Sequence, residues 1–523
     1  MNYARCDAVL PHCGMGRFPA TGRGKVAPET GSPDRRGSSL CAGRTAASLA
    51  RLPDPTRTAR PMTDPRLTGL QQAVPALRLK TDPADLAHYG RDWTAQWTPA
   101  PLAIALPASV AEVQAVVQWA NRQRVAIVPS GGRTGLSGGA VAANGELVLS
   151  LERMNQVLDF DPVDRTLTVQ AGMPLQALHE AARGHGLVYP VDFASRGSCT
   201  IGGNIATNAG GIRVIRYGNT REWIAGLTVV SGAGEVLELN RGLVKNSSGY
   251  DLRQLMIGSE GTLGIVVEAI VRLTDPPPPT SVMLLALPSF EVLMRVFAEF
   301  RGRLRLEAFE FFTDVALRHM LAHGAQPPME QQYPYYVVTE FASDREDTAA
   351  AAMAAFEHCM EQGWVADGVI AASEAQAAQI WRLREGITEA TVKYKPYKND
   401  IAVRVSAMPA FLDQAQALLG QAYPHFEVVW FGHIGDGNLH ISVLKPDDVS
   451  EQEFVAQCGQ VTGLLGQALK AHGGSISAEH GIGLLKKPYL DSTRDPAEVA
   501  LMRGIRKVFD PNGILNPGKV FDA

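Results

Sequence analysis

Two histidines that flank a turn near the C-terminal end of the chain could bind one divalent metal ion. Asp436-Gly437 is a strong two-residue turn signal, and apolar residues typical of strands stand on either side of it. If these two residues form the loop of a hairpin, His433 lies directly opposite His440, with the Cβ atoms roughly 5 Å apart. With Glu479 as a third ligand, the set leaves one coordination position open for a substrate, as a catalytic metal site requires. The alternative is a tight turn whose histidines are only hydrogen-bonded.

Three glycine-rich elements in the first half of the chain could hold a ligand that carries phosphate groups. The first, residues 129–139, follows a predicted strand and fits neither a Rossmann fingerprint nor a Walker loop. The second, residues 198–211, is rich in small residues, hydroxyls and amides, which suits a groove around an extended polar ligand. The third, residues 258–265, leads into a strand rich in valine and isoleucine. Glycine lets backbone N–H groups approach a pyrophosphate closely, although the first element could equally be a mobile surface loop.

The glycine-rich elements lie in a region where predicted strands and helices alternate. Ser109 fits an N-cap, and the apolar face of the helix that follows it is marked by Val113, Val116, Val117 and Ala120. Further expected elements are strands at 125–128, 146–151, 166–171, 226–231, 235–239 and 264–273, and a helix at 174–184.

Four consecutive prolines, residues 276–279, mark the clearest linker, because proline cannot continue a sheet. The residues beyond it predict a second α+β domain. Its expected elements are strands at 282–287, 335–340 and 401–405, and helices at 290–300, 348–362 and 373–393. No repeat of 20–50 residues is present, which excludes a solenoid or a propeller.

The composition is that of a globular protein with two or three domains. The chain has 523 residues, of which 46% are hydrophobic and 20% charged. No apolar run approaches the roughly 20 residues that would span a bilayer, so we expect no transmembrane segment. The formal net charge is -4, which gives no sign of a nucleic-acid-binding surface.

Residues 1–61 differ from the rest of the chain. They hold ten Lys and Arg against four Asp and Glu, with seven Gly and seven Pro. We expect a disordered N-terminal extension, which could result from a start codon chosen upstream of Met62; a transit peptide is the alternative. Three of the six cysteines lie in this segment, and the others form no CxxC pair. A disulfide framework is therefore not expected, and a reducing cytoplasm is the expected compartment, with peripheral association at a membrane left open.

Taken together, the motifs resemble one flavoprotein family. The three glycine-rich elements resemble the FAD-binding domain of the vanillyl-alcohol oxidase and p-cresol methylhydroxylase superfamily. The hairpin, Glu479-His480 and the terminal stretch Asp510–Lys519 are similar to the branch of D-2-hydroxyglutarate, D-lactate and glycolate dehydrogenases. The resemblance covers roughly residues 85 to 521, and the motifs occur in the order that the family shows.

This resemblance implies an α+β fold built from several parts. A two-part FAD-binding domain at 62–275 would precede an antiparallel-sheet substrate domain, or cap, at 280–425. Residues 426–523 would return to the active site and contact the metal and the flavin. The implied FAD contacts are Ser130, Gly131, Gly132, Arg133, Thr134, Gly135, Ser198, Gly202, Gly203, Asn204, Thr207, Ile265 and Asn516. Some family members attach the flavin through a histidine of the first loop, and that loop has none here, so non-covalent FAD is expected.

The resemblance also implies how a D-2-hydroxy acid would be oxidised. His433, His440 and Glu479 would hold a divalent metal, with zinc expected and manganese or iron left open. His480 would be the general base, the alternative being a histidine that only orients Glu479.

By resemblance, the substrate carboxylates would bind Arg384, Thr388 and Lys398. The first two stand at i and i+4 on the predicted helix and therefore on one face, although a charged surface helix would show the same spacing. Ser442 replaces an asparagine that such enzymes place two residues beyond the second histidine, which leaves the identity of the substrate open.

The expected activity is that of an FAD-dependent dehydrogenase acting on a D-2-hydroxy acid, with D-2-hydroxyglutarate favoured over D-lactate and glycolate. Electron-transfer flavoprotein, a quinone or a cytochrome would accept the electrons, and the oligomeric state is open, a homodimer included. The same fold supports a non-redox alkyl transferase, but the histidine-rich stretch of that class is absent here. An accessory flavin-binding subunit would lack the metal set, which this chain retains.

Overall fold

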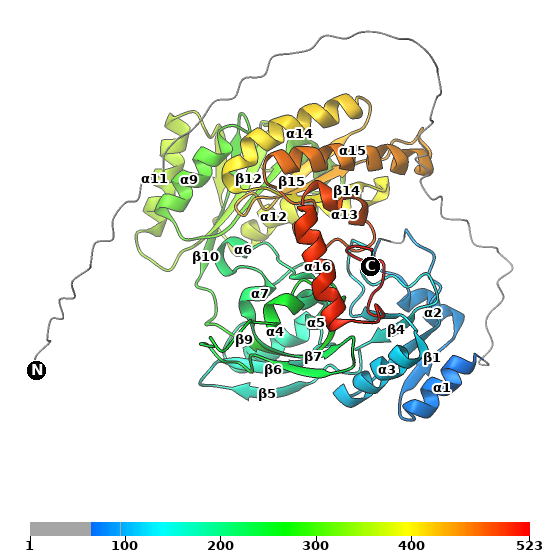
Figure 1. Cartoon of the computed structure of the whole chain (residues 1–523). Coiled ribbons are helices and arrows are strands. Elements are labelled where there is room, and N and C mark those ends of the chain that lie inside the picture. The colour runs from blue at the N-terminus through cyan, green and yellow to red at the C-terminus, as the bar shows by residue number, and fades with distance from the viewer. Residues whose placement is uncertain (1–63, 95, 523) are drawn as a thin grey trace, which may run out of the picture. The chain divides into compact units, whose positions relative to one another are not determined.

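The computed structural model describes residues 64–94 and 96–522, and the expectations for residues 1–61 lie outside this part of the chain. The described residues form three sheets, one of them mixed and two of them antiparallel, with helices packed against them (Figure 1). Among these residues, no helix is both long enough and apolar enough to cross a membrane. Cys199, Cys359 and Cys458 are buried free thiols.

The first sheet has four strands in the order β1-β2-β4-β3. Its strands are β1 (Arg78–Lys80), β2 (Ala103–Leu106), β3 (Ile127–Ser130) and β4 (Leu147–Ser150), with α1 (Pro65–Ala73), α2 (Pro83–Tyr89) and α3 (Val110–Gln123) alongside. The pairs β2-β4 and β3-β4 are parallel. The predicted N-cap of α3 is confirmed, because the Ser109 side chain accepts a hydrogen bond from the Glu112 N–H. The predicted apolar face of α3 is buried as well.

The second sheet has five antiparallel strands in the order β5-β6-β9-β7-β8. Its strands are β5 (Val157–Asp161), β6 (Thr166–Gln170), β7 (Ile224–Ser231), β8 (Val236–Leu239) and β9 (Gly264–Arg272). The helices of this region are α4 (Leu175–Gly184), α5 (Ile201–Thr207), α6 (Val214–Tyr217), α7 (Thr220–Trp223) and α8 (Arg253–Met256). One apolar core runs through the first two sheets, so they form one body.

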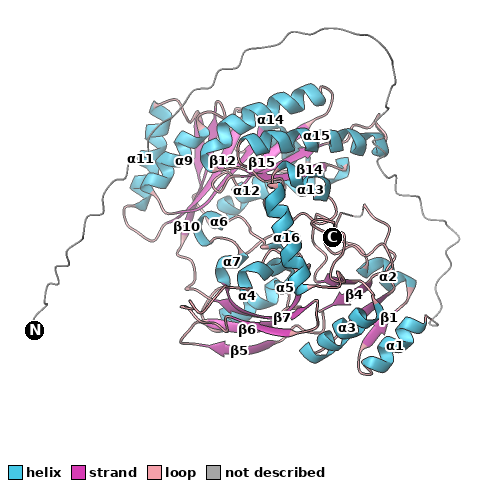
Figure 2. Cartoon of the chain, in the orientation of Figure 1, coloured by secondary structure: helices cyan, strands magenta, loops and turns pink. Residues whose placement is uncertain are grey.

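The third sheet has seven antiparallel strands in the order β13-β10-β12-β11-β15-β16-β14. Its strands are β10 (Thr280–Leu287), β11 (Leu306–Thr313), β12 (Tyr335–Ala342), β13 (Asp367–Ile370), β14 (Tyr397–Ala402), β15 (Val428–Gly432) and β16 (Asn438–Val443). One face packs on α9 (Leu293–Arg303), α11 (Thr348–Glu361), α14 (Met408–Ala422) and α15 (Glu451–Ala471). The other face packs on α10 (Asp314–Ala322), α12 (Glu374–Glu385) and α13 (Ile387–Thr391), as the layers of Figure 2 show. The prediction of an antiparallel sheet in the second domain is thus confirmed.

The C-terminal tail returns to the first sheet. Beyond the 3-10 helix η3 (Lys487–Ser492), α16 (Pro496–Phe509) runs from the third sheet toward the other two (Figure 1). The Asp510 carboxylate then accepts hydrogen bonds from the N–H groups of Ile514 and Leu515 at 3.0 and 2.9 Å. Ile127 of β3 donates its N–H to the Ile514 carbonyl and accepts one from Asn516, both at 2.7 Å. The tail therefore adds a short extended stretch to the edge of this sheet.

Two predictions about the second domain are wrong. A boundary after residue 425 would cut through one sheet, because β15 and β16 lie between β11 and β14. The predicted helix at 373–393 is three segments, α12, α13 and the 3-10 helix η1 (Val392–Tyr394). The first break falls at Gly386, where a Cβ would lie 2.6 Å from the Met320 Cε atom, and Thr388 of α13 is exposed while Arg384 of α12 is buried. These two residues are therefore not on one exposed face.

Candidate active site

The site lies on the face of the third sheet that also packs on α10, α12 and α13. Side chains alternate between the faces of a strand, and strand register places Asp400 of β14, His440 of β16 and Phe431 of β15 next to one another on this face. Phe312 of β11 pairs with Phe431, so Glu310, two residues earlier, points to the same face. The opposite face of these strands is apolar and belongs to the large core of the domain.

The predicted two-residue hairpin is wrong in its register. Phe431, not His433, pairs with His440, and the loop runs from residue 433 to residue 437. A type I′ turn needs positive φ at both central residues, and here only Gly437 has one, at 89°. The Asp436 and Asn438 N–H groups both donate to the His433 carbonyl at 3.2 Å and close this wider loop.

The two histidines nevertheless converge, and Glu479 joins them. Their rings lie 5.3 Å apart, and His433 Nε2 is 3.3 Å from Glu479 Oε1. One ligand atom from each of the three residues lies within 4.8 Å of the others. Two imidazoles and one carboxylate, gathered in this way, fit a divalent metal with room for further ligands.

A second group of potential ligands, Asp400, Glu479 and His480, has a different explanation. The Asp400 carboxylate accepts hydrogen bonds from the N–H groups of Glu479 and His480 at 3.0 and 3.1 Å, and from Asn438 Nδ2 at 2.9 Å. Lys486 Nζ lies 3.4 Å from the same carboxylate. Asp400 is therefore already supplied with donors, and it anchors the segment that carries Glu479 and His480.

Asp400 also faces two of the imidazoles. His480 Nδ1 lies 3.5 Å and His440 Nδ1 lies 3.8 Å from its oxygens. A carboxylate beside Nδ1 favours the tautomer with the proton on that nitrogen, which leaves Nε2 with its lone pair available. Burial lowers the pKa of His480 to about 4, although Asp400 opposes this effect. His480 is therefore neutral near pH 7.

Glu310 connects His433 with Arg384. Its carboxylate is 2.8 Å from His433 Nδ1 and 2.9 Å from Arg384 Nη2, and all three side chains are buried. The Arg384 guanidinium also lies over the Phe431 ring, with Cζ 4.9 Å from the ring centroid. The arginine is thus held from two sides, in the layer beside the metal ligands.

Two of the three predicted ligands favour a bound proton in the metal-free site, whereas burial holds the pKa of His440 well below its usual value. Burial by itself lowers the pKa of His433, but the carboxylates of Glu310 and Glu479 outweigh it and raise that pKa to about 9. Burial raises the pKa of Glu479 to about 7, with His433 opposing the rise. Positive charge is therefore favourable between these groups, which is the condition that a divalent cation meets.

The other predicted substrate residues lie in different surroundings. Lys398 stands opposite Ser442 in the β14-β16 register, two residues from the pair Asp400 and His440, so both share the face of the metal ligands. Among the described residues, Lys398 has no acidic partner, and burial lowers its pKa. Ser442 is buried. Thr388 is exposed on α13 and makes no side-chain hydrogen bond within the described part of the chain.

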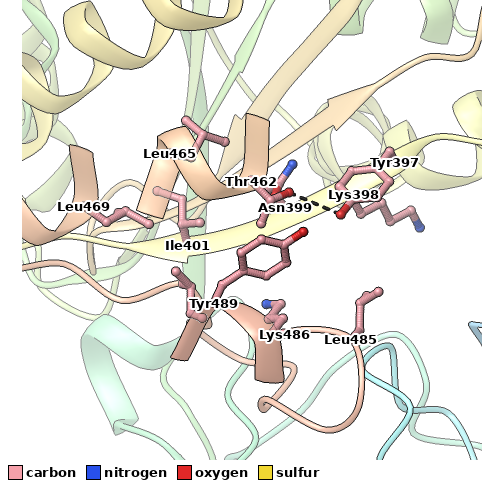
Figure 3. A pocket seen from close by; sticks show the side chains of 11 residues that line it. Tyr397, Lys398, Asn399, Ile401, Thr462, Leu465, Leu469, Leu485, Lys486 and Tyr489 are labelled. Carbon is pink, nitrogen blue, oxygen red and sulfur yellow. Dashed lines mark hydrogen bonds between the residues drawn. The ribbon is translucent and has the colours of Figure 1, made fainter. Parts of the chain in front are cut away.

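A small cavity lies behind the edge strand β14, between α15 and η3. It holds about 10 Å³, which is room for about one water molecule. Figure 3 shows the Tyr489 ring at its centre, with Lys486 and Leu485 on one side and the hydrogen-bonded pair Tyr397 and Thr462 on the other. The cavity as it stands is too small to hold an organic substrate.

Two of the predicted flavin elements pack against each other. A Cβ on Gly131 or Gly132 would collide with Thr200 Oγ1 or the Ser198 carbonyl, so glycine is needed for this close approach. Within the second element, residues Ile201–Thr207 form the helix α5. A Cβ on Gly202 would lie 2.8 Å from the Ala171 Cβ atom, so glycine at this position lets α5 pack closely against Ala171.

Several buried polar atoms of these elements fit a ligand such as FAD. Within the described residues, Ser130 Oγ, Thr200 Oγ1, Asn204 Nδ2 and Asn516 Oδ1 are buried without a hydrogen-bond partner. Such groups are rare in folded proteins unless a ligand or water satisfies them.

The remaining predicted flavin residues surround the same region. Arg133 has a positive φ of 59° and lies over the Tyr89 ring, with Cζ 4.5 Å from the ring centroid. Ile265 is the second residue of β9 and is buried, and Thr207 donates to the Gly203 carbonyl within α5. Thr134 and Gly135 continue the first loop beyond Arg133. Asn516 joins two elements, because its Nδ2 donates to the carbonyls of Gly139 and Glu260 at 3.0 and 2.8 Å.

Three carboxylates that support the site were missed in the sequence. Glu310 lies among apolar residues and Asp400 lies between Asn399 and Ile401, each within a strand, whereas Glu260 lies in the third glycine-rich element. An acid in a buried strand costs free energy unless it has partners, so this pattern could have identified Glu310 and Asp400 but not Glu260.

Comparison with known proteins supports the flavin reading. Two family models match, "FAD binding domain" over residues 101–240 and "FAD linked oxidases, C-terminal domain" over residues 276–520. A D-2-hydroxyglutarate dehydrogenase of Xanthomonas citri pv. viticola is 77% identical over 88% of this chain and 98% of its own. Another, of Stutzerimonas stutzeri, is 53% identical over 88% of this chain and 100% of its own.

A solved structure shares the fold. The crystal structure of p-cresol methylhydroxylase with substrate bound superposes with a TM-score of 0.69 at 15% sequence identity, covering 88% of this chain and 98% of that chain. Together with the two family models, this likeness confirms the predicted fold class, an α+β chain with an FAD-binding domain and an antiparallel-sheet second domain.

Proposed function

Since the chain belongs to the family of FAD-linked oxidases, we propose that it is an FAD-dependent dehydrogenase that oxidises D-2-hydroxyglutarate to the 2-oxo acid. The proposal is supported by the sequence identity with two D-2-hydroxyglutarate dehydrogenases and by one observation on the site. His433, His440 and Glu479 converge beside a neutral His480, on the same sheet face as an arginine and a lysine that could bind carboxylates.

In this proposal, each group on the sheet face has a separate duty. The ligand set His433, His440 and Glu479 would hold a divalent metal, zinc being our choice, which would lower the pKa of a bound hydroxyl and bind the adjacent carboxylate. His480 would accept the hydroxyl proton at Nε2, since Asp400 faces its Nδ1. Bound FAD would supply the acceptor for the hydride that leaves C2.

Substrate binding would use the cations beside the metal ligands. Arg384 pairs with Glu310 and lies over Phe431, which places its guanidinium for the carboxylate next to the reacting carbon. Lys398 has no acidic partner among the described residues and would bind the distal carboxylate, with Ser442 opposite it on the neighbouring strand. Thr388 would contribute a hydroxyl from α13, a role that its exposed position makes the weakest of the four.

The flavin would bind non-covalently against the two packed glycine-rich elements. Ser130, Asn204 and Asn516 present buried polar atoms there, and the first loop has no histidine. Acid precipitation of the purified protein should therefore release intact FAD into the supernatant. Flavin retained in the pellet would contradict this mode of binding.

A substrate panel tests the proposed activity. Purified FAD-loaded protein is assayed with the D and L forms of 2-hydroxyglutarate and lactate, and with glycolate, using an artificial dye as electron acceptor. We expect D-2-hydroxyglutarate to give the highest kcat/KM and a chelator to abolish turnover until metal is restored. No turnover with the dicarboxylate would leave D-lactate or glycolate as the substrate.

The physiological electron acceptor and the compartment belong to the same proposal. We place the enzyme in the cytoplasm, where buried free thiols such as Cys199 stay reduced. Electron-transfer flavoprotein, a quinone and a cytochrome are the three acceptor classes to compare in place of the dye, and size-exclusion chromatography tests for a homodimer.

A further inference from the structure

We infer that Glu260 is a positioning residue that fixes the segment carrying His480 against the flavin-binding domain. This inference rests on the proposed function for its catalytic meaning. Glu260 lies in the third glycine-rich element, between α8 and β9, far in sequence from His480. The segment that it holds is residues 478–485, here called the base segment.

The contacts from the Glu260 carboxylate are specific. Its Oε1 accepts the Ile482 N–H at 2.7 Å, and its Oε2 accepts the Gly483 N–H at 2.8 Å. Both carboxylate oxygens are therefore used, one for each of two consecutive N–H groups. The side chain is buried, so these bonds form away from competing water.

The Glu260 backbone is also fixed by several contacts. Its φ is 52°, a left-handed conformation that a residue with a Cβ seldom adopts. Its N–H donates to the Ala206 carbonyl at 2.8 Å, and its carbonyl accepts from Asn516 Nδ2 at 2.8 Å. Ala206 belongs to α5, and Asn516 is a predicted flavin contact, so the carboxylate is anchored to the elements expected around the cofactor.

The base segment is shaped to accept this support. Gly481 and Gly483 both have positive φ, at 76° and 51°, and a Cβ on Gly481 would lie 2.8 Å from the Glu260 carboxylate carbon. A Cβ on Gly483 would collide with the Ser137 carbonyl of the first glycine-rich element. That carbonyl accepts the N–H groups of Leu484 and Leu485, both at 2.9 Å. The first and third glycine-rich elements therefore both bind the base segment.

The N-terminal end of the base segment is tied to the third sheet. Asp400 accepts hydrogen bonds from the N–H groups of Glu479 and His480. Lys486, which directly follows the base segment and is labelled in Figure 3, also donates to the Asp400 carboxylate. The metal ligand and the base therefore stay with the sheet if the Glu260 contact is lost. What changes is the placement of this group relative to the flavin domain.

Because the base stays with the sheet while its position relative to the flavin domain changes, Glu260→Gln should slow flavin reduction without weakening substrate binding. Glutamine keeps one acceptor oxygen but places an amide donor against a backbone N–H, so one of the two bonds becomes a repulsion. A misplacement of about 1 Å in a reacting pair can cost on the order of 10²-fold in rate. Flavin reduction at saturating substrate should fall by about that factor, while the substrate dissociation constant, the metal content and the FAD content remain close to those of the wild type.

The experiment combines two measurements on the full-length, FAD-loaded, metal-loaded protein. Stopped-flow reduction by D-2-hydroxyglutarate gives the rate and the dissociation constant separately. Amide hydrogen exchange, measured without substrate, should be faster in residues 481–485 of Glu260→Gln. Glu268→Gln is the matched control, because this carboxylate lies on β9 and makes no ion pair or hydrogen bond within the described residues.

Each outcome decides the inference. Unchanged exchange in residues 481–485, or a loss of rate that follows a loss of FAD or metal, would overturn it. If Glu260→Gln does not fold, Gly481→Ala disturbs the same contact from the other side and must show the same split between rate and dissociation constant. If the wild-type flavin is reduced by no 2-hydroxy acid, the proposed function fails, while the exchange measurement still decides whether Glu260 holds the segment.

Discussion

Replacing Glu310 with glutamine should weaken metal binding, although Glu310 is not itself a predicted ligand. The carboxylate lies 2.8 Å from His433 Nδ1 and 2.9 Å from Arg384 Nη2, with less than a tenth of each side chain exposed. Glutamine is neutral and has one acceptor oxygen in place of two, so His433 Nδ1 faces an uncharged amide and Arg384 loses its ion pair. Loss of the group that orients a metal-bound histidine typically reduces metal affinity by about 10–100-fold. At about 1.4 kcal/mol for each factor of ten, this corresponds to roughly 1.4–2.8 kcal/mol.

The assay is competition for zinc between the FAD-loaded protein and a chromophoric chelator. Glu310 also helps to raise the pKa of His433 to about 9, so its removal weakens the binding of the proton that competes with zinc for His433. Below pH 9 this effect opposes the expected loss of zinc affinity. Titrations at pH 8 and pH 9.5 therefore separate the loss of zinc affinity from the change in proton competition. Glu307→Gln is the control, since Glu307 is another buried carboxylate of β11 but lies 3.3 Å from Arg216. Equal zinc affinities for wild type, Glu307→Gln and Glu310→Gln at pH 9.5 would refute the reasoning.

Three further predictions concern the same site. His440→Ala should lose both the metal and turnover, whereas His480→Ala should keep the metal while turnover falls on the order of 10²–10⁴-fold. Metal analysis beside initial rates tests this, and a metal-free His480→Ala protein would make His480 a ligand. Lys398→Ala should raise KM for D-2-hydroxyglutarate much more than for D-lactate, which lacks a distal carboxylate, and equal changes in steady-state kinetics would contradict that role. In the metal-free protein, stability should fall as the pH rises from 6.5 to about 9, because the pKa of His433 is raised above its usual 6.5 and its proton is lost across that range. The raised pKa of Glu479 has the same sign but acts at lower pH, between its usual 4.5 and about 7. Bound zinc should remove this slope, and a melting temperature in chelator that does not change with pH would count against it.

The fold and the ligand set could be predicted because their signals are local. The capping serine of α3, the alternation of the strands and the glycine-rich elements each act over a few residues, and most predicted strands lie within three residues of those observed. The turn at Asp436-Gly437 was misread because Asp436 does not adopt the positive φ that a two-residue turn requires. The histidines still meet, because His433 is the first residue of the wider loop and its ring is held beside the sheet by the Glu310 carboxylate.

The partners of the supporting carboxylates could not be predicted, because each pair joins segments far apart in the sequence. Glu310 is separated from His433 by 123 residues, and Glu260 from Ile482 by 222 residues. No periodicity or turn signal reports such pairs, since only the assembled sheets bring them together. The break of the predicted helix at Gly386 has a similar cause, because the obstacle to a side chain there is Met320 of another helix.

The return of the C-terminal tail to β3 limits when the protein can fold during its synthesis. Arg124, just before that strand, donates to the Asn512 side chain across 388 residues of sequence, and the Ile127 pairing with the tail spans a similar length. At about 5–20 residues per second, the ribosome needs roughly 20–80 seconds to make the intervening chain. Throughout that interval the edge of β3 has unpaired backbone groups that could pair with another nascent chain. Deletion of the last ten residues, which include no metal ligand, should therefore reduce the yield of soluble protein.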